Sequence, residues 1–551
     1  MPELPPGWVL MAGALAVPLL PARLRAAWVL MLTALSAWLL HRTPDHVAPA
    51  VEFLGLTLHT VQLDALSRLF AWAFHAALGV ATVYALRERD GVQLTAAPLY
   101  AGAAIAATCA GDLITLFVFW ELTAVSTALV WATRTESALR AGLRYLLWQV
   151  GSGVAMLIGI ALLTAAGHER LDPVAVGSVG ALALMLGLGV KAGFPALHCW
   201  VPDAYPRATP AGAVYLSLFS TKLAIYALAR LYAGAEVLVV LGAISAVGAT
   251  VYAAAQDDLR RLLAYVLVAQ LGVSVVGIGL GGGALDGAVR HAIAGQAYLG
   301  LLFMATGAVL TATGSVRISQ VAGVAWRMPL TALAVVAGGL TAAGLPLLAG
   351  YPGKTLILDE AVLAGTEVWL ALSFTAAGTA YLCALRLPWA LLGPRPAHTT
   401  WCEAPPAQLA GMALAAAACA VLGLVGLPGN HVPLNLAHAG TQCLLLAGVA
   451  VVFALAVASR TERRDVYATP PEVDWALRVA LPETFIAGRT AWREALTALG
   501  ENVLPATGRM VATTYERYFS PRGLWGSAWP TGRILLYTAA VLGAYLVASF
   551  V

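Results

Sequence analysis

Four charged side chains lie deep inside apolar stretches of the chain, and these residues could carry chemistry. Glu121 stands in the middle of DLITLFVFWELTAVSTALV, residues 112–130. Three lysines have similar surroundings: Lys191 in LGLGVKAGFPALHCW, Lys222 in SLFSTKLAIYAL and Lys354 in AGLPLLAGYPGKTLILDE. An ionisable group at membrane depth is costly and is normally retained for function. A carboxylate together with several amines favours one chemistry, the binding and release of protons.

The electrostatics of a buried acid–base pair supply the mechanism. Removing an amine from water favours its neutral form, whereas a nearby carboxylate favours the ammonium form. Making or breaking a Glu121–Lys191 pair would therefore move a proton on or off. His198 and His291 can bridge such groups near neutral pH. Taken one at a time, Lys222 or Lys354 could extend its amine to the membrane surface, and His291 could be a structural core residue.

The composition identifies the elements that must position these groups. Hydrophobic residues make up 60% of the 551 residues and charged residues only 11%. Apolar runs of about 17–25 residues recur along the whole chain, and we expect about sixteen spans, among them residues 8–22 and 212–232. Lipid offers no partner to the backbone, so each run must be helical, and the runs are too long for barrel strands. The first run lacks a basic leader segment and is expected to remain as a span. The chain is predicted to be an all-α polytopic membrane protein.

Glycine and proline interrupt two of the predicted helices, each beside a lysine. Lys191 is followed by Gly193 and Pro195, and Lys354 is preceded by Pro346, Pro352 and Gly353. Such residues break the helical hydrogen-bond ladder, which is tolerated only against protein or a water-filled cavity. Two broken helices, one in each half of the chain, are typical of a transporter built from repeats.

Basic residues predict the orientation of the chain. Alternate loops carry most of the arginines, whereas the intervening loops hold only Arg42 and Arg170. The positive-inside rule then places both termini on the outer face of a bacterial cell membrane. After the last of the closely spaced runs, residues 460–531 mix charges with apolar residues at roughly helical spacing. This pattern favours an interfacial amphipathic segment over a solvated linker, followed by a terminal span at 532–551.

Several blocks of the sequence resemble one family, the antiporter-like subunits of respiratory complex I, membrane-bound hydrogenases and multisubunit Mrp cation/proton antiporters. The blocks are FVFWELTAVSTALV, KAGFPALHCWVPDAYPRATPAGAVYLSLFSTKLAIYALARL, DDLRRLLAYVLVAQLGV and GLPLLAGYPGKTLIL. The resemblance covers roughly residues 55–390. It implies a core of about fourteen helices with two inverted five-helix repeats. It also implies that Glu121 is the essential glutamate, Lys191 and Lys354 the broken-helix lysines, and Lys222 the connecting lysine.

The expected division of the chain follows from these blocks. It comprises N-terminal helices (1–110), a first repeat (111–255), a second repeat (256–400), C-terminal core helices (401–459), the cytoplasmic or interfacial segment (460–531) and a terminal transmembrane helix (532–551).

One stretch departs from the family pattern. The family usually has H-x-x-x-H-x-x-x-K before an LLF-x-x-x-G run, whereas this chain has His291, Gly295 and Leu299 at those positions. Leucine cannot carry a proton. The link towards Lys354 would then need His291, Gln296, Tyr298 or ordered water, or else the relay is incomplete.

The function predicted from these residues is that of a proton-translocating membrane subunit in a multisubunit ion-transport complex. The resemblance favours an Mrp D-like subunit, with Na⁺ or K⁺ exchanged for protons. Alternatives within the superfamily are a complex I or hydrogenase subunit, and the membrane half of an inorganic-carbon uptake system with a large soluble partner. Alternatives of other classes are a scaffold subunit with vestigial charges and a free-standing transporter of an organic solute.

No chemistry on covalent bonds is indicated by the sequence. The six cysteines include no C-x-x-C pair, which argues against an iron–sulfur site or a disulfide framework. GLGGGALDG lies between spans and is expected to be a turn, not a phosphate loop. We therefore expect no cofactor, metal or nucleic-acid partner. The expected partners are other membrane subunits or a soluble protein, and the lipid bilayer.

Overall fold

The computed structural model describes residues 6–45, 50–53, 56–393, 400–427, 436–458 and 513–517. The chain divides into two compact units, Met1–Pro470 and Pro471–Val551. The predicted interfacial segment 460–531 and terminal span 532–551 lie outside the described residues, apart from residues 513–517, which are helical. All elements named below belong to the first unit.

The first unit is built almost wholly of helices, which confirms the predicted all-α fold. In the described ranges, ten helices are long and apolar enough to cross a membrane, and three shorter apolar helices accompany them. One hairpin departs from the expectation: strands β1 (Val51–Phe53) and β2 (Leu56–Leu58) pair in antiparallel fashion. The two strands are only three residues each, so they leave the helical architecture unchanged.

The N-terminal helices pack on one another through small residues. They are α1 (Gly7–Ala14), η1 (Val17–Leu19), α2 (Arg25–Arg42), α3 (Ala65–Tyr84) and α4 (Gly91–Thr108). The expected span 8–22 consists of α1 and η1, which are short. A Cβ atom added at Gly7 would lie 2.1 Å from the carbonyl oxygen of Gly102, so α1 and α4 meet at van der Waals distance only because both positions are glycine.

The first half of the core carries Glu121, Lys191 and Lys222. Its elements are α5 (Leu113–Leu122), η2 (Thr123–Ser126), α6 (Thr127–Trp131), α7 (Glu136–Ala165), α8 (Val179–Ala192), α9 (Trp200–Ala204), η3 (Tyr205–Arg207), α10 (Pro210–Leu218), α11 (Ser220–Leu231) and α12 (Glu236–Ala254). Asp64 caps the N-terminus of α3 and accepts a hydrogen bond from Arg230 at 2.5 Å, which ties α11 to the N-terminal helices.

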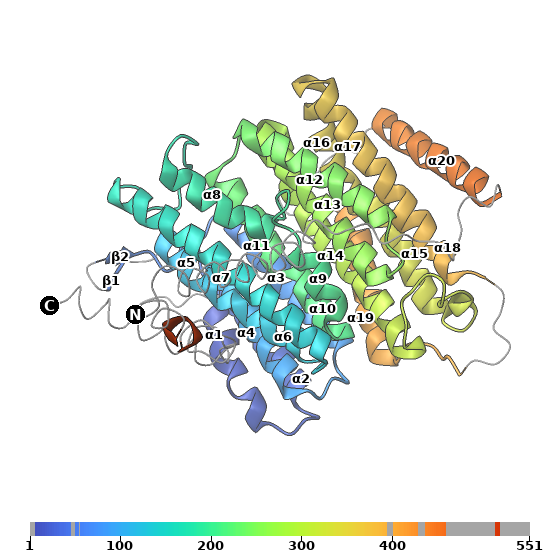
Figure 1. Ribbon diagram of the computed structural model, residues 1–551, viewed down its shortest axis with the longest axis horizontal. Helices are drawn as coiled ribbons and strands as arrows, with labels where there is room; N and C mark the ends of the chain where they lie inside the picture. Colours follow the sequence, from blue (N-terminus) through green and yellow to red (C-terminus); the bar gives the residue numbers. More distant parts are fainter. Residues whose placement is uncertain are drawn as a thin grey trace, which may run out of the picture. The chain divides into compact units, whose positions relative to one another are not determined.

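The second half carries His291 and Lys354. Its elements are α13 (Leu259–Leu280), α14 (Gly282–Thr313), η4 (Val324–Trp326), α15 (Pro329–Ala343), α16 (Gly350–Ala364), α17 (Thr366–Thr379), the π-helix η5 (Ala380–Arg386), α18 (Leu387–Leu391), α19 (Pro406–Leu424) and α20 (Leu436–Ala458). Figure 1 shows α12, α13 and α14 side by side, and α14 also packs on α16.

Both predicted helix breaks are present, and their backbones match. Helix α8 ends at left-handed Gly193 (φ 77°), and α15 ends at left-handed Gly344 (φ 83°). Three residues later each break has a second positive φ, 64° at Ala196 and 71° at Leu347. The local sequences, AGFPAL and AGLPLL, share the Ala-Gly-x-Pro order. Similar residues thus impose the same turn twice.

A third break was not predicted from the sequence. The run 212–232 was expected to be one continuous helix, but α10 and α11 are separated at Phe219, where φ is −112° and ψ is −74°. The break contains neither glycine nor proline. Its cause is found in the side chains that bind its backbone, which are described below.

Glycines bring α14 and α16 together beside the second-half lysine. A Cβ atom added at Gly353 would lie 2.6 Å from the backbone nitrogen of His291 and 2.7 Å from the carbonyl oxygen of Gly287. Neither contact atom belongs to a flexible side chain, so a larger residue at position 353 must push the helices apart. The residue next to Lys354 therefore sets the distance between the two helices.

We expect Gly353→Ala to lower the free energy of unfolding by about 1–3 kcal/mol, because overpacking a close helix contact forces backbone shifts. The measurement is the apparent Tm of the purified full chain in detergent. The matched control is Gly79→Ala in α3, where an added Cβ atom has nothing within 4 Å. At that position alanine lowers the conformational entropy of the unfolded chain, so the Tm is expected to stay the same or rise. Equal behaviour of the two variants would contradict the close packing.

Candidate functional site

Lys191 is fully buried at the C-terminal end of α8 and is held by the segment that follows Glu121. Its side-chain nitrogen donates to Thr123 Oγ1 at 2.9 Å and to the carbonyl oxygen of Trp120 at 3.4 Å. The same nitrogen lies 4.7 Å from the centroid of the Trp120 ring, a cation–π distance. At Thr123 the helix tightens into η2, which places this hydroxyl towards Lys191.

Glu121 lies close to Lys191 but does not form an ion pair with it within 4.0 Å. The two charges interact electrostatically, while Thr123 takes the direct hydrogen bond to the amine. The carboxylate packs against α7, where a Cβ atom added at Gly153 would lie 2.3 Å from Glu121 Oε1. The predicted acid–base pair is thus brought together, while the Lys191 amine bonds the Thr123 hydroxyl and not the carboxylate.

Three neutral polar residues near Glu121 were missed by the sequence analysis. Tyr145 and Gln149 precede Gly153 by two turns and one turn on the same face of α7. The Tyr145 hydroxyl is 2.7 Å from Ser126 Oγ. Gln149 is 1% exposed, and within the described residues neither of its amide atoms has a partner. The spacing of these polar residues along an apolar helix is the signal that would have found them.

Lys222 is buried at the unpredicted break and binds the backbone there. Its amine donates to the carbonyl oxygen of Ser217 at 2.8 Å. The neighbouring carbonyl of Leu218 accepts from Gln296 Nε2 at 2.9 Å. Gln296, predicted as a relay helper, therefore binds the carbonyl next to the one that holds Lys222. Because Lys222 is only 2% exposed, its amine does not extend to the membrane surface.

Two tyrosines bind further backbone groups at this break, one carbonyl and one N–H. Tyr205 donates to the carbonyl oxygen of Leu216 at 2.7 Å. The Tyr100 hydroxyl accepts from the Ser220 N–H at 2.8 Å and donates to Ser220 Oγ at 2.7 Å. Side chains thus replace the helical hydrogen bonds lost between α10 and α11. This explains how a helix can break without glycine or proline.

His198 lies in the non-helical segment after α8. Its Nδ1 is 3.4 Å from the carbonyl oxygen of Phe194, and among the described residues Nε2 has no hydrogen-bond partner. The ring stands edge-on to Tyr265, with 6.3 Å between centroids. Its position in the break that follows Lys191 fits the predicted bridging role, which stays a prediction.

Lys354 lies on α16, after the break in the second half, and its amine reaches back to α15, before the break. Its amine, on a residue 6% exposed, donates to the carbonyl oxygen of Ala342, the residue that precedes Ala-Gly-x-Pro in the second half. Lys191 occupies the same place relative to that motif in the first half. Lys191 itself stands at the position before Ala-Gly-x-Pro, whereas Lys354 follows the motif and reaches that position with its amine. Gln442 of α20 donates to the next carbonyl, Ala343, at 2.8 Å.

His291 lies on α14 where this helix crosses α16. It is 1% exposed, and neither ring nitrogen has a hydrogen-bond partner in the part of the chain that the structure describes. The ring lies near enough to both Lys222 and Lys354 for an electrostatic interaction with each lysine. Leu299, two turns further on, is 1% exposed and offers no polar atom.

The described residues contain no cluster of three or more His, Cys, Asp or Glu side chains that could hold a metal ion. The predicted residues instead form three groups along the core: Glu121 with Lys191, Lys222 with Gln296, and His291 with Lys354. Tyr298 belongs to the third group, since its ring centroid lies 6.5 Å from that of His291. Such a row suits the passage of protons more than the binding of one ligand.

Comparisons with known proteins identify the family of the chain. Residues 110–379 match the transmembrane family described as NADH:quinone oxidoreductase/Mrp antiporter. An uncharacterized protein of Mycobacterium tuberculosis is 31% identical over 426 residues, which cover 69% of this chain and 67% of the relative. The chain belongs to the NADH:quinone oxidoreductase/Mrp antiporter family.

Two further matches are a curated oxidoreductase subunit and a chain of a solved Mrp complex. NADH-quinone oxidoreductase subunit N of Desulforudis audaxviator is 35% identical over 297 residues, which are 50% of this chain and 59% of that subunit. The Mrp complex from Dietzia sp. DQ12-45-1b has a chain with a TM-score of 0.73 and 25% identity. That match covers 92% of this chain and 62% of the Mrp chain. This chain thus has the fold of a multi-pass membrane subunit.

Removing the hydroxyl that binds the Lys191 amine should destabilise the protein. In Thr123→Val the shape is kept but the Lys191 amine loses its shortest hydrogen bond, at an expected cost of about 1–3 kcal/mol. The matched control is Thr127→Val, because the Thr127 hydroxyl is buried without a partner among the described residues. We expect a lower apparent Tm in detergent for the first variant only. A Tm drop of equal size in both would show that Thr123 does not support Lys191.

Proposed function

We propose that this chain is a proton-translocating subunit of a multisubunit membrane complex that exchanges protons for Na⁺ or K⁺. One observation carries the proposal: three buried lysines bind neutral oxygen atoms, not carboxylates. Lys191 binds a hydroxyl and a carbonyl, and Lys222 and Lys354 bind carbonyls freed at helix breaks. A buried ammonium held by neutral oxygens releases its proton more readily than one paired with a carboxylate. These lysines are therefore suited to load and unload protons.

The arrangement of the groups supports a relay through the core. Glu121 and Lys191 form the first station, because their charges interact and the Thr123 hydroxyl binds the amine. Lys222 forms the second, at the break between α10 and α11. His291 lies within electrostatic range of both Lys222 and Lys354 and in this proposal passes a proton from one to the other. In this proposal His198 serves the first station and Gln296 the second.

The family relationship supports an assembly with other membrane subunits. A chain of the solved Mrp complex matches 92% of this chain at 25% identity. We propose on this basis that the chain is an Mrp D-like subunit of a bacterial cell membrane, with both termini outside and partners in the bilayer. Residues 111–255 and 256–400 would be its inverted repeats, as the matching backbones of the two breaks suggest.

A second candidate function is a membrane subunit of a redox complex. It is favoured by the 35% identity to NADH-quinone oxidoreductase subunit N. In that setting the same relay would be driven by a partner's redox reaction and not by a cation gradient. Purification of the chain with its native partners separates the two, since only the redox assembly would contain an oxidoreductase.

Glu121→Gln tests whether the relay operates. The amide keeps the size of the side chain but cannot attract or exchange a proton as the carboxylate does. We expect proton flux into vesicles containing the full chain and its co-purified subunits to fall by about tenfold or more, which corresponds to a barrier rise of about 1.4 kcal/mol. A pH-sensitive dye trapped in the vesicles reports the flux under an imposed gradient.

The control for this test is Glu136→Gln. Glu136 is exposed at the start of α7 and binds only Arg140 among the contacts described for it, one turn away on the same helix. Flux in this variant should equal that of the unchanged protein. Normal flux and normal assembly in Glu121→Gln would instead favour the scaffold alternative, in which the charges are vestigial.

A further inference from the structure

We propose that Tyr298 and Gln270 build a neutral polar link that joins His291 to Lys354 past the apolar Leu299. The inference rests on the proposed proton-translocating function and assigns positioning roles within it. Tyr298 was named from the sequence only as one of several helpers, and Gln270 was not named at all. Three independent features of the second half of the core support the link.

The first feature is the position of the Tyr298 hydroxyl. An aromatic side chain on a helix points back towards the preceding turn. Accordingly, a Cβ atom added at Gly295 would lie 3.5 Å from the Tyr298 hydroxyl oxygen. The hydroxyl thus fills the space in front of Gly295, where the family usually has a histidine. Glycine at 295 and tyrosine at 298 together restore a polar group at this point of α14.

The second feature is a chain of hydrogen bonds that connects three helices. Tyr298 on α14 donates to Gln270 Oε1 on α13 at 3.3 Å. Gln270 Nε2 then donates to Thr379 Oγ1 on α17 at 2.9 Å, and Thr379 donates to the carbonyl oxygen of Thr375 at 2.7 Å. All four side chains are buried. The chain therefore fixes the orientation of the Gln270 amide in a water-poor interior.

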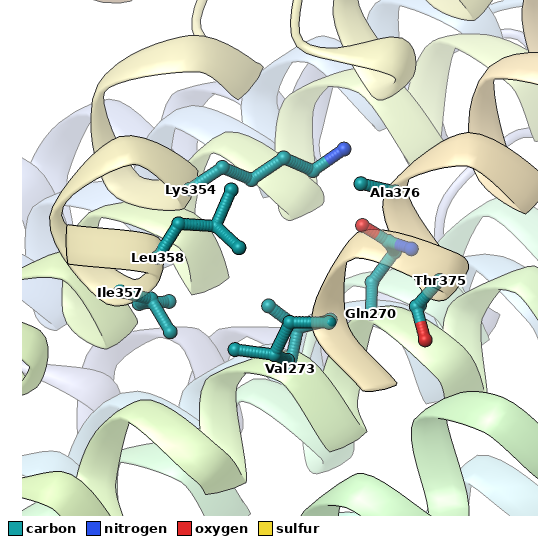
Figure 2. A pocket seen from close by; sticks show the side chains of 8 residues that line it. Gln270, Val273, Lys354, Ile357, Leu358, Thr375 and Ala376 are labelled. Carbon is teal, nitrogen blue, oxygen red and sulfur yellow. The ribbon is translucent and has the colours of Figure 1, made fainter. Parts of the chain in front are cut away.

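The third feature is a small cavity between Gln270 and Lys354. Its polar lining comes from Gln270, Lys354 and Thr375, and the remaining lining residues are apolar: Val273, Ile357, Leu358, Leu372 and Ala376. In Figure 2 the Lys354 side chain extends from α16 towards Ala376 and the Gln270 amide. The cavity leaves about 10 Å³ for the centre of a water molecule, roughly what one bound water needs.

His291 completes the arrangement on the other side of the link. Its ring nitrogens have no partner within the described residues, an unusual state for a polar group that is 1% exposed. The close contact of α14 with α16 at Gly353 brings the His291 backbone next to the residue before Lys354. A buried water is the expected partner for such nitrogens, and the Tyr298 hydroxyl lies on the same helix to orient it.

The proton step can be written with its charges balanced. A protonated His291 ring gives one proton to water, and the water passes one proton to the neutral Lys354 amine. His291 ends neutral, Lys354 ends as an ammonium ion, and the water is unchanged. Tyr298 and Gln270 keep their own protons throughout. They are positioning residues that hold the water where Leu299 offers nothing.

Tyr298→Phe and Gln270→Leu test the link, since each removes polar atoms and nearly keeps the volume. We expect each to lower proton flux about tenfold in vesicles that contain the full chain with its co-purified subunits. The matched control is Tyr84→Phe. The Tyr84 hydroxyl is also buried and also bonds α14, at the carbonyl oxygen of Met304, but it lies outside the link. Flux in this control should stay normal.

A rescue separates a positioning role from simple packing. Leu299→Lys places a proton-carrying amine on α14 that does not depend on the hydroxyl. Combined with Tyr298→Phe, it should restore most of the lost flux, and it should not rescue Glu121→Gln. A correctly assembled double variant with flux no higher than that of Tyr298→Phe would overturn the inference.

The outcomes also separate this inference from the proposed function. If Glu121→Gln abolishes flux while Tyr298→Phe and Gln270→Leu behave like Tyr84→Phe, the relay operates by another route and the link is wrong. If Glu121→Gln leaves flux unchanged, the proposed function fails and the link fails with it. Loss of flux in all three, with a normal Tyr84→Phe control and rescue by Leu299→Lys, supports both.

Discussion

Unpaired carbonyl groups at helix breaks are the constraint on which this core depends. A membrane helix that stops inside the protein leaves backbone oxygens without donors, and lipid cannot supply them. A buried lysine has the opposite need, because its amine must find acceptors. In this protein the two needs are met together: Lys222 binds a carbonyl beside the break at Phe219, and Lys354 binds a carbonyl beside the break at Gly344. Each break and its lysine stabilise one another.

The repeated turn shows how sequence and backbone cooperate. In both halves an Ala-Gly-x-Pro stretch adopts two left-handed residues, although the second of these is alanine in one case and leucine in the other. A non-glycine residue in this conformation is strained, and such strain persists only where surrounding contacts hold it. The helices that follow the two breaks, α9 and α16, therefore occupy positions imposed by the core around them.

Much of this arrangement could be predicted from residue types that stand out against an apolar background. Glu121, Lys191 and the two glycine- and proline-flanked breaks were recognisable because each is rare and costly at membrane depth. The break at Phe219 was not, since its cause is the set of donors Tyr205, Lys222 and Gln296, which meet only in the fold.

Neutral polar side chains explain the rest of what was missed. Gln149 and Gln270 carry no charge, so their types predict little by themselves. Their importance depends on which helix faces them, and the sequence contains that information only through tertiary packing. For the same reason the sequence predicted that Glu121 and Lys191 would be neighbours but not that the Lys191 amine would bond Thr123.

The bond between Lys222 and the Ser217 carbonyl has a mechanical consequence. A hydrogen bond from an ammonium group is roughly twice as strong as one from a neutral amine. In the proposed relay, loss of the proton from Lys222 would weaken this bond to the end of α10, and return of the proton would strengthen it. The adjacent carbonyl, Leu218, is held by Gln296 of α14. The charge on Lys222 would then change how firmly the C-terminal end of α10 is held, at a break that α14 of the second half also binds.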